Sequence, residues 1–241
     1  MKKLLGDHLK IEERKFFHSL VFPLFIVFIL MVVKLVETLE GISLVRFGVK
    51  PLLVERIWTI ITAPFIHGNL DHLLGNCTSF LVLGSSLFYF YSKAAYRIFF
   101  TIWILAGVGL WIIGRNSYHI GFSGIIYGLI LFLILGSIIR GNKALGAVSF
   151  LVVLFYGSFI WGILPLDANL PYSWEAHLAG SLAGVIASIF FRNVSPSGLI
   201  VEPRYSFEDE EDSEVAESDR YWEVSFEKSE DERGERSESI N

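Results

Sequence analysis

The sequence predicts an all-α membrane protein built as a bundle of six transmembrane helices. Of its 241 residues, 53% are hydrophobic and only 19% are charged, a composition that is not typical of a water-soluble globular protein. Six apolar runs are each long enough to cross about 30 Å of hydrocarbon as a helix. They lack the alternating polarity of a transmembrane β-barrel, and open sheet edges cannot be satisfied in lipid. Each run is therefore expected to be a helix.

The predicted spans cover most of the first 191 residues. They run approximately over 17–36, 70–92, 95–113, 122–139, 145–164 and 174–191. The connection between the first two spans is too long for a tight turn and is rich in Leu, Val, Ile, Phe and Trp. We therefore expect this first loop to pack in or on the membrane.

Charge divides the chain into an N-terminal segment (1–16), the helical core (17–192) and a C-terminal tail (193–241). From Ser195 onward there are 16 acidic and 5 basic residues, a net charge of −11, so the remainder carries +6 of the total −5. The tail has too few apolar residues to bury, and we expect it to be disordered. Lys and Arg gather in one set of short connections, which predicts that both termini are cytoplasmic in a multi-pass protein of the cell membrane.

Strongly polar residues lie at the starts of three predicted spans. His72 and Asn76 lie at the second, Ser123 and Tyr127 at the fourth, and His177 at the sixth. Polar groups are costly in hydrocarbon, so each is a candidate functional residue. By the predicted topology, all three starts lie near the outer face of the membrane at comparable depth.

Small residues flank two of these polar positions. On the fourth span they are Gly121, Gly124 and Gly128, and on the sixth they are Gly180 and Gly184. Small residues at this spacing let neighbouring helices approach closely. Such packing would bring Ser123 within hydrogen-bonding reach of His177.

These residue types suit acyl transfer. Histidine can accept the proton of a serine nucleophile and return it, and attack on an amide also needs donors for the oxyanion. His72, Asn76 and the unpaired backbone N–H groups of a helix start could supply those donors. The fourth and sixth spans contain no Asp, and Glu175 lies on a different helix face from His177. We therefore predict a Ser-His dyad.

Three motifs together resemble the rhomboid intramembrane serine proteases. They are "HGNLDHLLGN", "GFSG" with Tyr127 four residues after its serine, and "AHLAGSLAG", each on its expected span. The resemblance implies that Ser123 is the nucleophile and His177 is the base. It further implies that His72 and Asn76 are the side chains of the oxyanion hole.

The resemblance covers roughly residues 17–192 and implies a six-helix rhomboid-like fold with a membrane-embedded first loop. Tyr127 would stack beside the catalytic histidine, Gly121 and Gly124 would permit the tight loop and close packing, and His67 would be structural. Transmembrane proteins in a lipid bilayer would be the substrates, cleaved in or near their membrane-spanning segments. No cofactor, metal or nucleic-acid partner is expected, and the oligomeric state is not indicated.

One position departs from the family pattern. Family members often carry Trp-Arg in the first loop, whereas here Trp58 is followed by Thr59. Another residue must then brace this loop, and Arg56 is the candidate.

The fifth span has no candidate catalytic group and carries Gly and Pro near its outer end, so we expect it to act as a lateral gate.

Simpler interpretations stay open at this point. Ser123 alone could be a helix N-cap or a packing residue, His177 a packed histidine, and Asn76 an interhelical hydrogen-bonding residue. A catalytically inactive family member that grips transmembrane helices would also carry much of this pattern.

A transporter is a further alternative. His67, His72 and His177 with Asp71 could bind a metal or relay protons, because such groups also cluster inside membranes. His67 and His72 are five residues apart, however, which is a poor spacing for a shared helix face, and Asn76 is an unusual ligand.

Overall fold

The computed structural model describes residues 2–141, 145–148, 151, 154, 162–164 and 173–196, with side chains from residue 10 onward. The chain divides into two compact units, Met1–Leu199 and Ile200–Asn241, and all described residues belong to the first. The predicted acidic tail beyond residue 196 and most of the predicted fifth span, with its expected gate, therefore lie outside the described residues.

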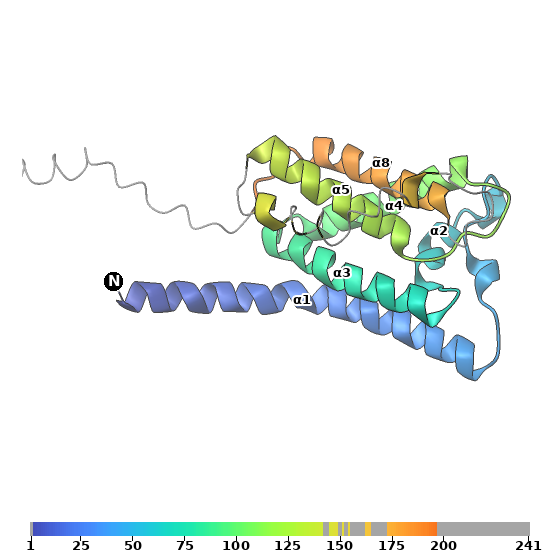
Figure 1. Cartoon of the computed structure of the whole chain (residues 1–241), viewed down its shortest axis with the longest axis horizontal. Coiled ribbons are helices and arrows are strands. Elements are labelled where there is room, and N and C mark those ends of the chain that lie inside the picture. The colour runs from blue at the N-terminus through green and yellow to red at the C-terminus, as the bar shows by residue number, and fades with distance from the viewer. Residues whose placement is uncertain are drawn as a thin grey trace, which may run out of the picture. The chain divides into compact units, whose positions relative to one another are not determined.

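The described part of the chain is a helical bundle (Figure 1). Its long helices are α1 (Lys2–Leu39), α3 (Leu70–Phe90), α4 (Ala95–Ile113), α5 (Ser123–Arg140) and α8 (Trp174–Phe190). The first four are long and apolar enough to cross a membrane, and α8 is a shorter apolar helix. No strand occurs in this part of the chain, only one isolated bridge between Val49 and His119. The predicted all-α membrane bundle is confirmed, although α1 begins well before the predicted first span.

Side-chain caps fix where α3 and α8 begin. Asn69 Oδ1 accepts the N–H of His72 at 2.8 Å, and Ser173 Oγ accepts the N–H of Ala176 at 3.1 Å. Such caps satisfy backbone donors that have no acceptor within the helix. Because His72 and His177 lie in the first turns of these helices, the caps also set the positions of two candidate site residues.

The helices pack so that three of their starts lie at one end of the bundle. α5 packs extensively against α8, α4 also packs against α8, and α1 lies along α3. Figure 1 shows the starts of α3, α5 and α8 at the same end. Rings of Phe80, Phe99, Trp103 and Phe122 contact one another between α3, α4 and the start of α5. This aromatic core supports the end at which the candidate residues gather.

Glycines bring the backbones of α5 and α8 into direct contact. A Cβ added to Gly180 would overlap the carbonyl oxygen of Gly124, and one added to Gly184 would overlap that of Gly128. Only residues without a side chain allow this approach. The predicted close packing of two small faces is confirmed.

The first loop, residues 40–69, folds into short helices against the bundle. These are η1 (Val45–Phe47), η2 (Val54–Arg56), α2 (Thr59–Thr62) and η3 (Ala63–Phe65). Its inner side buries Thr59, Ile60 and Ala63, whereas its outer side exposes Leu52, Val54, Ile57, Trp58 and Ile61. An apolar outer side is expected of a loop that contacts lipid.

Arg56 braces this loop, as the missing Trp-Arg pair led us to expect. Its guanidinium donates a hydrogen bond to the Arg46 carbonyl and lies 6.0 Å from the centre of the Tyr118 ring. Thr59 is fully buried, and its hydroxyl donates to the Arg56 carbonyl at 2.6 Å. Thr59 thus holds the backbone from which Arg56 reaches across the loop.

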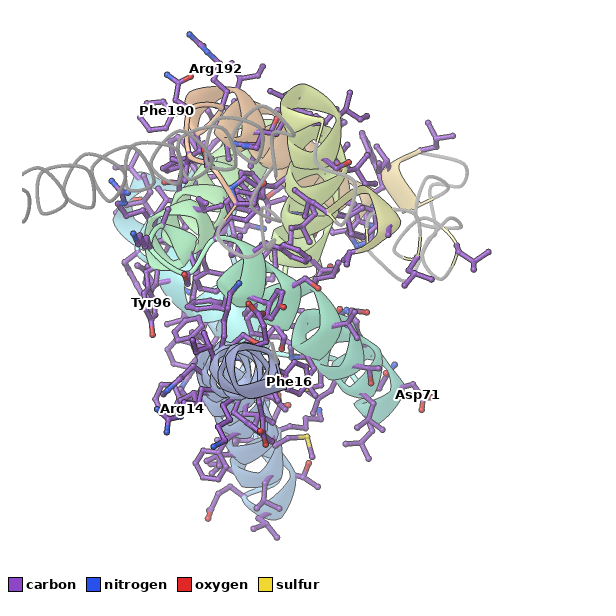
Figure 2. All side chains as sticks on the ribbon, turned by 90° about the vertical axis from the view of Figure 1, so that its left-hand side faces the viewer. Arg14, Phe16, Asp71, Tyr96, Phe190 and Arg192 are labelled. Atoms are coloured by element: carbon purple, nitrogen blue, oxygen red, sulfur yellow. The ribbon has the colours of Figure 1, made fainter. Side chains whose placement is uncertain are left out.

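The outer surfaces of the helices are apolar. Phe17, Phe25 and Phe28 of α1 are all more than half exposed. At the ends of the helices, Asp71, Phe190 and Arg192 project away from the bundle (Figure 2). Such extensive exposed apolar surface is stable in hydrocarbon rather than in water.

Candidate active site

Ser123 and His177 lie within hydrogen-bonding distance across the contact between α5 and α8. Ser123 is the first residue of α5, and its Oγ is 2.9 Å from His177 Nε2. On the other side of the ring, His177 Nδ1 is 2.9 Å from the carbonyl oxygen of Gly162. A carbonyl oxygen can only accept, so Nδ1 carries the proton and Nε2 presents its lone pair to the serine hydroxyl. This tautomer is the one that a general base requires.

The nearest acidic residue in the sequence is engaged elsewhere. Glu175 is 1% exposed, and its carboxylate accepts hydrogen bonds from the Arg115 N–H at 3.3 Å and the Ser173 hydroxyl at 3.2 Å. The carbonyl of Gly162 therefore occupies the place that a carboxylate has in a triad. This arrangement agrees with a dyad.

Tyr127 holds the plane of the histidine ring. It lies one turn after Ser123 on α5, and its ring stacks on that of His177 at 4.0 Å between centroids and 6° between planes. A Cβ on Gly162 would overlap the Tyr127 hydroxyl and lie 3.0 Å from His177 Nδ1. Gly162 is therefore a site residue that could not be assigned from sequence. It contributes a backbone carbonyl, and its lack of a side chain leaves room for the Tyr127 hydroxyl and the His177 ring.

Gly121 places the loop before Ser123 against the two predicted oxyanion-hole side chains. Its φ of 107° is a conformation that glycine adopts readily. A Cβ there would lie 2.9 Å from His72 Cε1 and 3.8 Å from Asn76 Nδ2. Because Ser123 begins α5, its own N–H has no intrahelical acceptor. His72 and Asn76 thus lie against Gly121, two residues before Ser123.

His67 contacts Asn76 rather than serving only as a loop anchor. Asn76 Nδ2 donates to His67 Nε2 at 2.9 Å, and the Phe122 N–H points to the same nitrogen at 3.4 Å. An accepting ring nitrogen must be unprotonated. Burial is the main cause that lowers the pKa of His67 from 6.5 to about 4, so the ring is neutral at neutral pH. His67 therefore orients the Asn76 amide.

A charged pair on α1 braces the backbone that leads into α3. Lys34 Nζ donates to Glu37 at 2.8 Å and to the His67 carbonyl at 3.0 Å, while the Glu37 carboxylate accepts the Leu44 N–H at 3.0 Å. Charges at the end of an apolar helix require such partners. The pair could have been found in the sequence as two opposite charges, three residues apart, within an otherwise apolar run.

A cavity of about 440 Å³ opens at Ser123. Its lining includes His72, Ser123, Asp71, Arg115, His119 and Ser173. Polar groups on its walls can hold water, which hydrolysis requires. Within the described ranges, no three His, Cys, Asp or Glu residues are grouped so that they could hold a metal ion.

Comparison with known proteins agrees with this architecture. The Rhomboid domain family matches residues 54–194, which is more than half of the chain. An uncharacterized protein of Mycobacterium tuberculosis is 37% identical over 174 residues, covering 66% of this chain and 70% of that protein. An uncharacterized protein of Mycobacterium leprae is 31% identical over 169 residues, covering 66% of each chain.

A further relative, matched over a shorter stretch, carries an informative name. A protein of Acanthamoeba polyphaga mimivirus, named as a rhomboid protein, is 32% identical over 133 residues, covering 53% of this chain and 71% of its own length. The family match agrees with the apolar helices and with the helix contacts described above. This chain is an integral membrane protein and belongs to the rhomboid family.

Proposed function

We propose that this protein is an intramembrane serine endopeptidase that hydrolyses peptide bonds in or near transmembrane segments of other membrane proteins. The observation that carries the proposal is the pairing of Ser123 Oγ with His177 Nε2 at 2.9 Å, with Nδ1 bonded to the Gly162 carbonyl at 2.9 Å. A protein that only bound other helices would not need a histidine held in this tautomer. The chain belongs to the rhomboid family, whose members are usually such proteases, and this membership supports the same activity.

The first half-reaction forms an acyl-enzyme. Ser123 Oγ attacks the carbonyl carbon of the scissile bond while His177 Nε2 takes the hydroxyl proton. The developing oxyanion accepts hydrogen bonds from His72, Asn76 and the N–H of Ser123. His177 then gives its proton to the amide nitrogen as the carbon–nitrogen bond breaks, and the new amine leaves.

The second half-reaction consumes water from the cavity. His177 takes one proton from the water as its oxygen attacks the acyl carbon, and returns it to Ser123 Oγ as the ester bond breaks. The products are a carboxylic acid and the regenerated serine. An intact substrate helix hides its carbonyls in hydrogen bonds, so we expect small or helix-weakening residues near the cleaved bond.

The orientation in the membrane follows from the basic residues. Arg14, Lys93, Arg97, Arg140 and Arg192 lie on the side opposite the helix starts that carry the site. The positive-inside rule then places this side in the cytoplasm and opens the site to the outer face. Labelling of single introduced cysteines by a membrane-impermeant reagent in intact cells tests this. Labelling of position 118 but not of position 192 is expected, and the reverse pattern would contradict the assignment.

Cleavage of a reporter transmembrane substrate in reconstituted bilayers tests the activity. Wild-type protein should cleave it and should be labelled by a fluorophosphonate, whereas Ser123→Ala and His177→Ala should do neither. Ser137→Ala is the matched control, because Ser137 lies on the same helix and bonds only to the backbone of its own helix, at Ile134. Undiminished cleavage by Ser123→Ala would refute the proposal. Folded wild-type protein with no labelling and no cleavage would instead support the inactive, helix-binding alternative.

A further inference from the structure

A polar cluster, largely buried except at the exposed side chain of Arg115, lies just outward of the dyad and takes part in no chemical step of the mechanism above. It joins the loop between α4 and α5 to the start of α8. Its members are Arg115, His119, Ser173 and Glu175, and we call it the outer clamp. His119 is 3% exposed and Glu175 is 1% exposed, so both side chains are withdrawn from solvent. His119 lies four residues before Ser123, and Glu175 lies two residues before His177.

Two links make up the outer clamp, and the contact between Ser173 Oγ and Glu175 Oε2 at 3.2 Å joins them. In the first, His119 Nδ1 is 2.7 Å from Ser173 Oγ, and His119 Nε2 is 3.0 Å from the Arg115 carbonyl oxygen. In the second, Glu175 Oε1 accepts the Arg115 N–H at 3.3 Å and lies 3.5 Å from the Arg115 guanidinium. Both links run from the loop that leads into the nucleophile to the turn that leads into the base.

The hydrogen-bond donors and acceptors of the first link fit a neutral histidine. The Arg115 carbonyl can only accept, so His119 Nε2 carries the proton and Nδ1 is an acceptor. The single proton of the Ser173 hydroxyl is shared between His119 Nδ1 at 2.7 Å and the Glu175 carboxylate at 3.2 Å. Burial is the main cause that lowers the pKa of His119, which agrees with the neutral form. Ser173 Oγ meanwhile accepts the Ala176 N–H as the cap of α8. The same hydroxyl thus fixes the start of α8 and joins it to His119.

The backbone of His119 extends the connection to the first loop. Its N–H donates to the Val49 carbonyl, and its carbonyl accepts the Val49 N–H, each at 2.9 Å. The imidazole is therefore mounted on a rigid backbone rather than on a flexible loop. Inward of the dyad, the glycine contacts between α5 and α8 set the distance between the helices. Outward of it, the outer clamp sets the distance between the segments from which these helices begin.

We propose that His119 and Glu175 are positioning residues for the Ser123–His177 dyad, because their links hold the two segments that carry the nucleophile and the base at a fixed separation. This inference rests on the proposed function, since a dyad must react for its positioning to matter. Reaction rates depend steeply on such geometry, and a displacement of about 1 Å can lower a rate by as much as ~100-fold.

The test measures fluorophosphonate labelling of purified full-length protein, with the amplitude and the rate constant determined separately. The amplitude counts folded sites, and the rate constant reports how well His177 activates Ser123. In Glu175→Ala and His119→Phe we expect a rate constant lower by about tenfold, with kcat lowered in proportion and KM within about twofold of wild type. Glu175→Gln keeps an oxygen that can accept the Arg115 N–H and should restore most of the rate. Ser188→Ala, a buried serine farther along α8 that bonds only to Val185 of its own helix, is the matched control.

Hydrogen exchange gives a second measurement that needs no turnover. Amides in residues 114–122 and 173–180 should exchange faster in Glu175→Ala and His119→Phe than in wild type, because they lose the links between these segments. Unchanged exchange in both segments would overturn the clamp itself. If Glu175→Ala does not fold, His119→Phe carries the test.

Two further outcomes would also overturn the inference. Full amplitude with a wild-type rate constant in both variants would show that the clamp does not position the dyad. A lower amplitude with an unchanged rate constant per labelled site would reduce its role to stability. A wild-type protein that is never labelled would refute the proposed function, whereas the exchange measurement would still report whether the clamp holds the two segments.

Discussion

The Asn76 side chain has two N–H groups, and one of them donates to His67 Nε2 at 2.9 Å. The second N–H group of Asn76 can donate to a substrate oxyanion only while His67 keeps the amide in this orientation. Removal of one oxyanion-hole donor typically lowers kcat by about 10²–10³-fold, which is the expected effect of Asn76→Ala. We expect His67→Ala to lower kcat by about tenfold, because the amide stays present but loses its orientation.

A double-mutant cycle separates this orienting role from independent effects. If His67 acts through Asn76, His67→Ala combined with Asn76→Ala should cleave no more slowly than Asn76→Ala alone. The measurement is kcat for the reporter substrate, corrected for the amount of folded protein. Effects that multiply in the double variant would contradict the assigned role and return His67 to a purely structural one.

The neutral state of His67 also predicts how stability depends on pH. Its pKa is about 4 in the folded protein against an ordinary value of 6.5, so the unfolded state binds more protons between these values. The stabilisation is fully present above about pH 6.5 and is lost as pH falls toward 4, to a total of roughly 3 kcal/mol. Thermal unfolding in detergent across this range measures the loss.

His67→Gln is the comparison for that experiment. The glutamine carbonyl can still accept from Asn76 but does not titrate, so the variant should show a shallower loss of stability on acidification. Some slope should persist, because burial also lowers the pKa of His119. If the unfolding temperatures of wild type and His67→Gln fell equally with pH, His67 would not contribute to the acid sensitivity.

Local sequence spacing predicts only part of the site. Ser123, His177 and Tyr127 could be found because each stands out as a polar group within an apolar helix. The Gly162 carbonyl could not, because every residue has one and only the fold decides which carbonyl meets His177 Nδ1. The bonds of Glu175 were hidden for the same reason, since its partner Arg115 lies 60 positions away along the chain.

At the scale of elements, the contact between α5 and α8 determines whether the two halves of the dyad meet. Gly180 is the most sensitive position, because a Cβ there would overlap backbone atoms of Gly124 rather than a movable side chain. Gly180→Ala should therefore separate the helices and destabilise the protein by about 1–3 kcal/mol. Cleavage should fall by about 100-fold as Ser123 moves away from His177.

Gly75→Ala provides the matched control for this prediction. Gly75 also lies within a helix, α3, but a Cβ there would meet no atom within 4 Å. The substitution should leave cleavage unchanged and raise helix stability, by up to about 1 kcal/mol. Unfolding temperature and cleavage are measured for both variants. If Gly75→Ala and Gly180→Ala had the same unfolding temperature and the same cleavage, Gly180 would not be needed for the close approach of the two helix backbones.

Helix lengths were more predictable than loop structure. Hydrocarbon thickness sets a minimum length for a span, and the predicted runs 95–113 and 174–191 agree closely with α4 and α8. The first loop obeys no such constraint. Its short helices form because Thr59, Ile60 and Ala63 pack against the bundle, and packing of that kind cannot be inferred from the loop sequence by itself.

At the scale of the whole molecule, the two ends of the bundle have different tasks. The end with the starts of α3, α5 and α8 carries every candidate catalytic group. At the opposite end, Arg140 closes the bundle: its guanidinium donates to the Val194 carbonyl at 2.9 Å and also to the carbonyl of Phe191. The chain just beyond α8 thus belongs to the core, and the acidic tail begins after it.

Two truncations test this division of the chain. Removing residues 197–241 keeps Phe191 and Val194 and should leave cleavage and unfolding temperature close to those of the full chain. Removing everything after Phe190 also deletes both carbonyls, leaving the half-buried Arg140 guanidinium without these acceptors. Hydrogen bonds to charged groups contribute about 1.5–3 kcal/mol each, so the shorter truncation product should unfold several degrees lower. A large loss of cleavage in the first truncation, with unchanged unfolding temperature, would instead assign the acidic tail a direct part in catalysis or substrate binding.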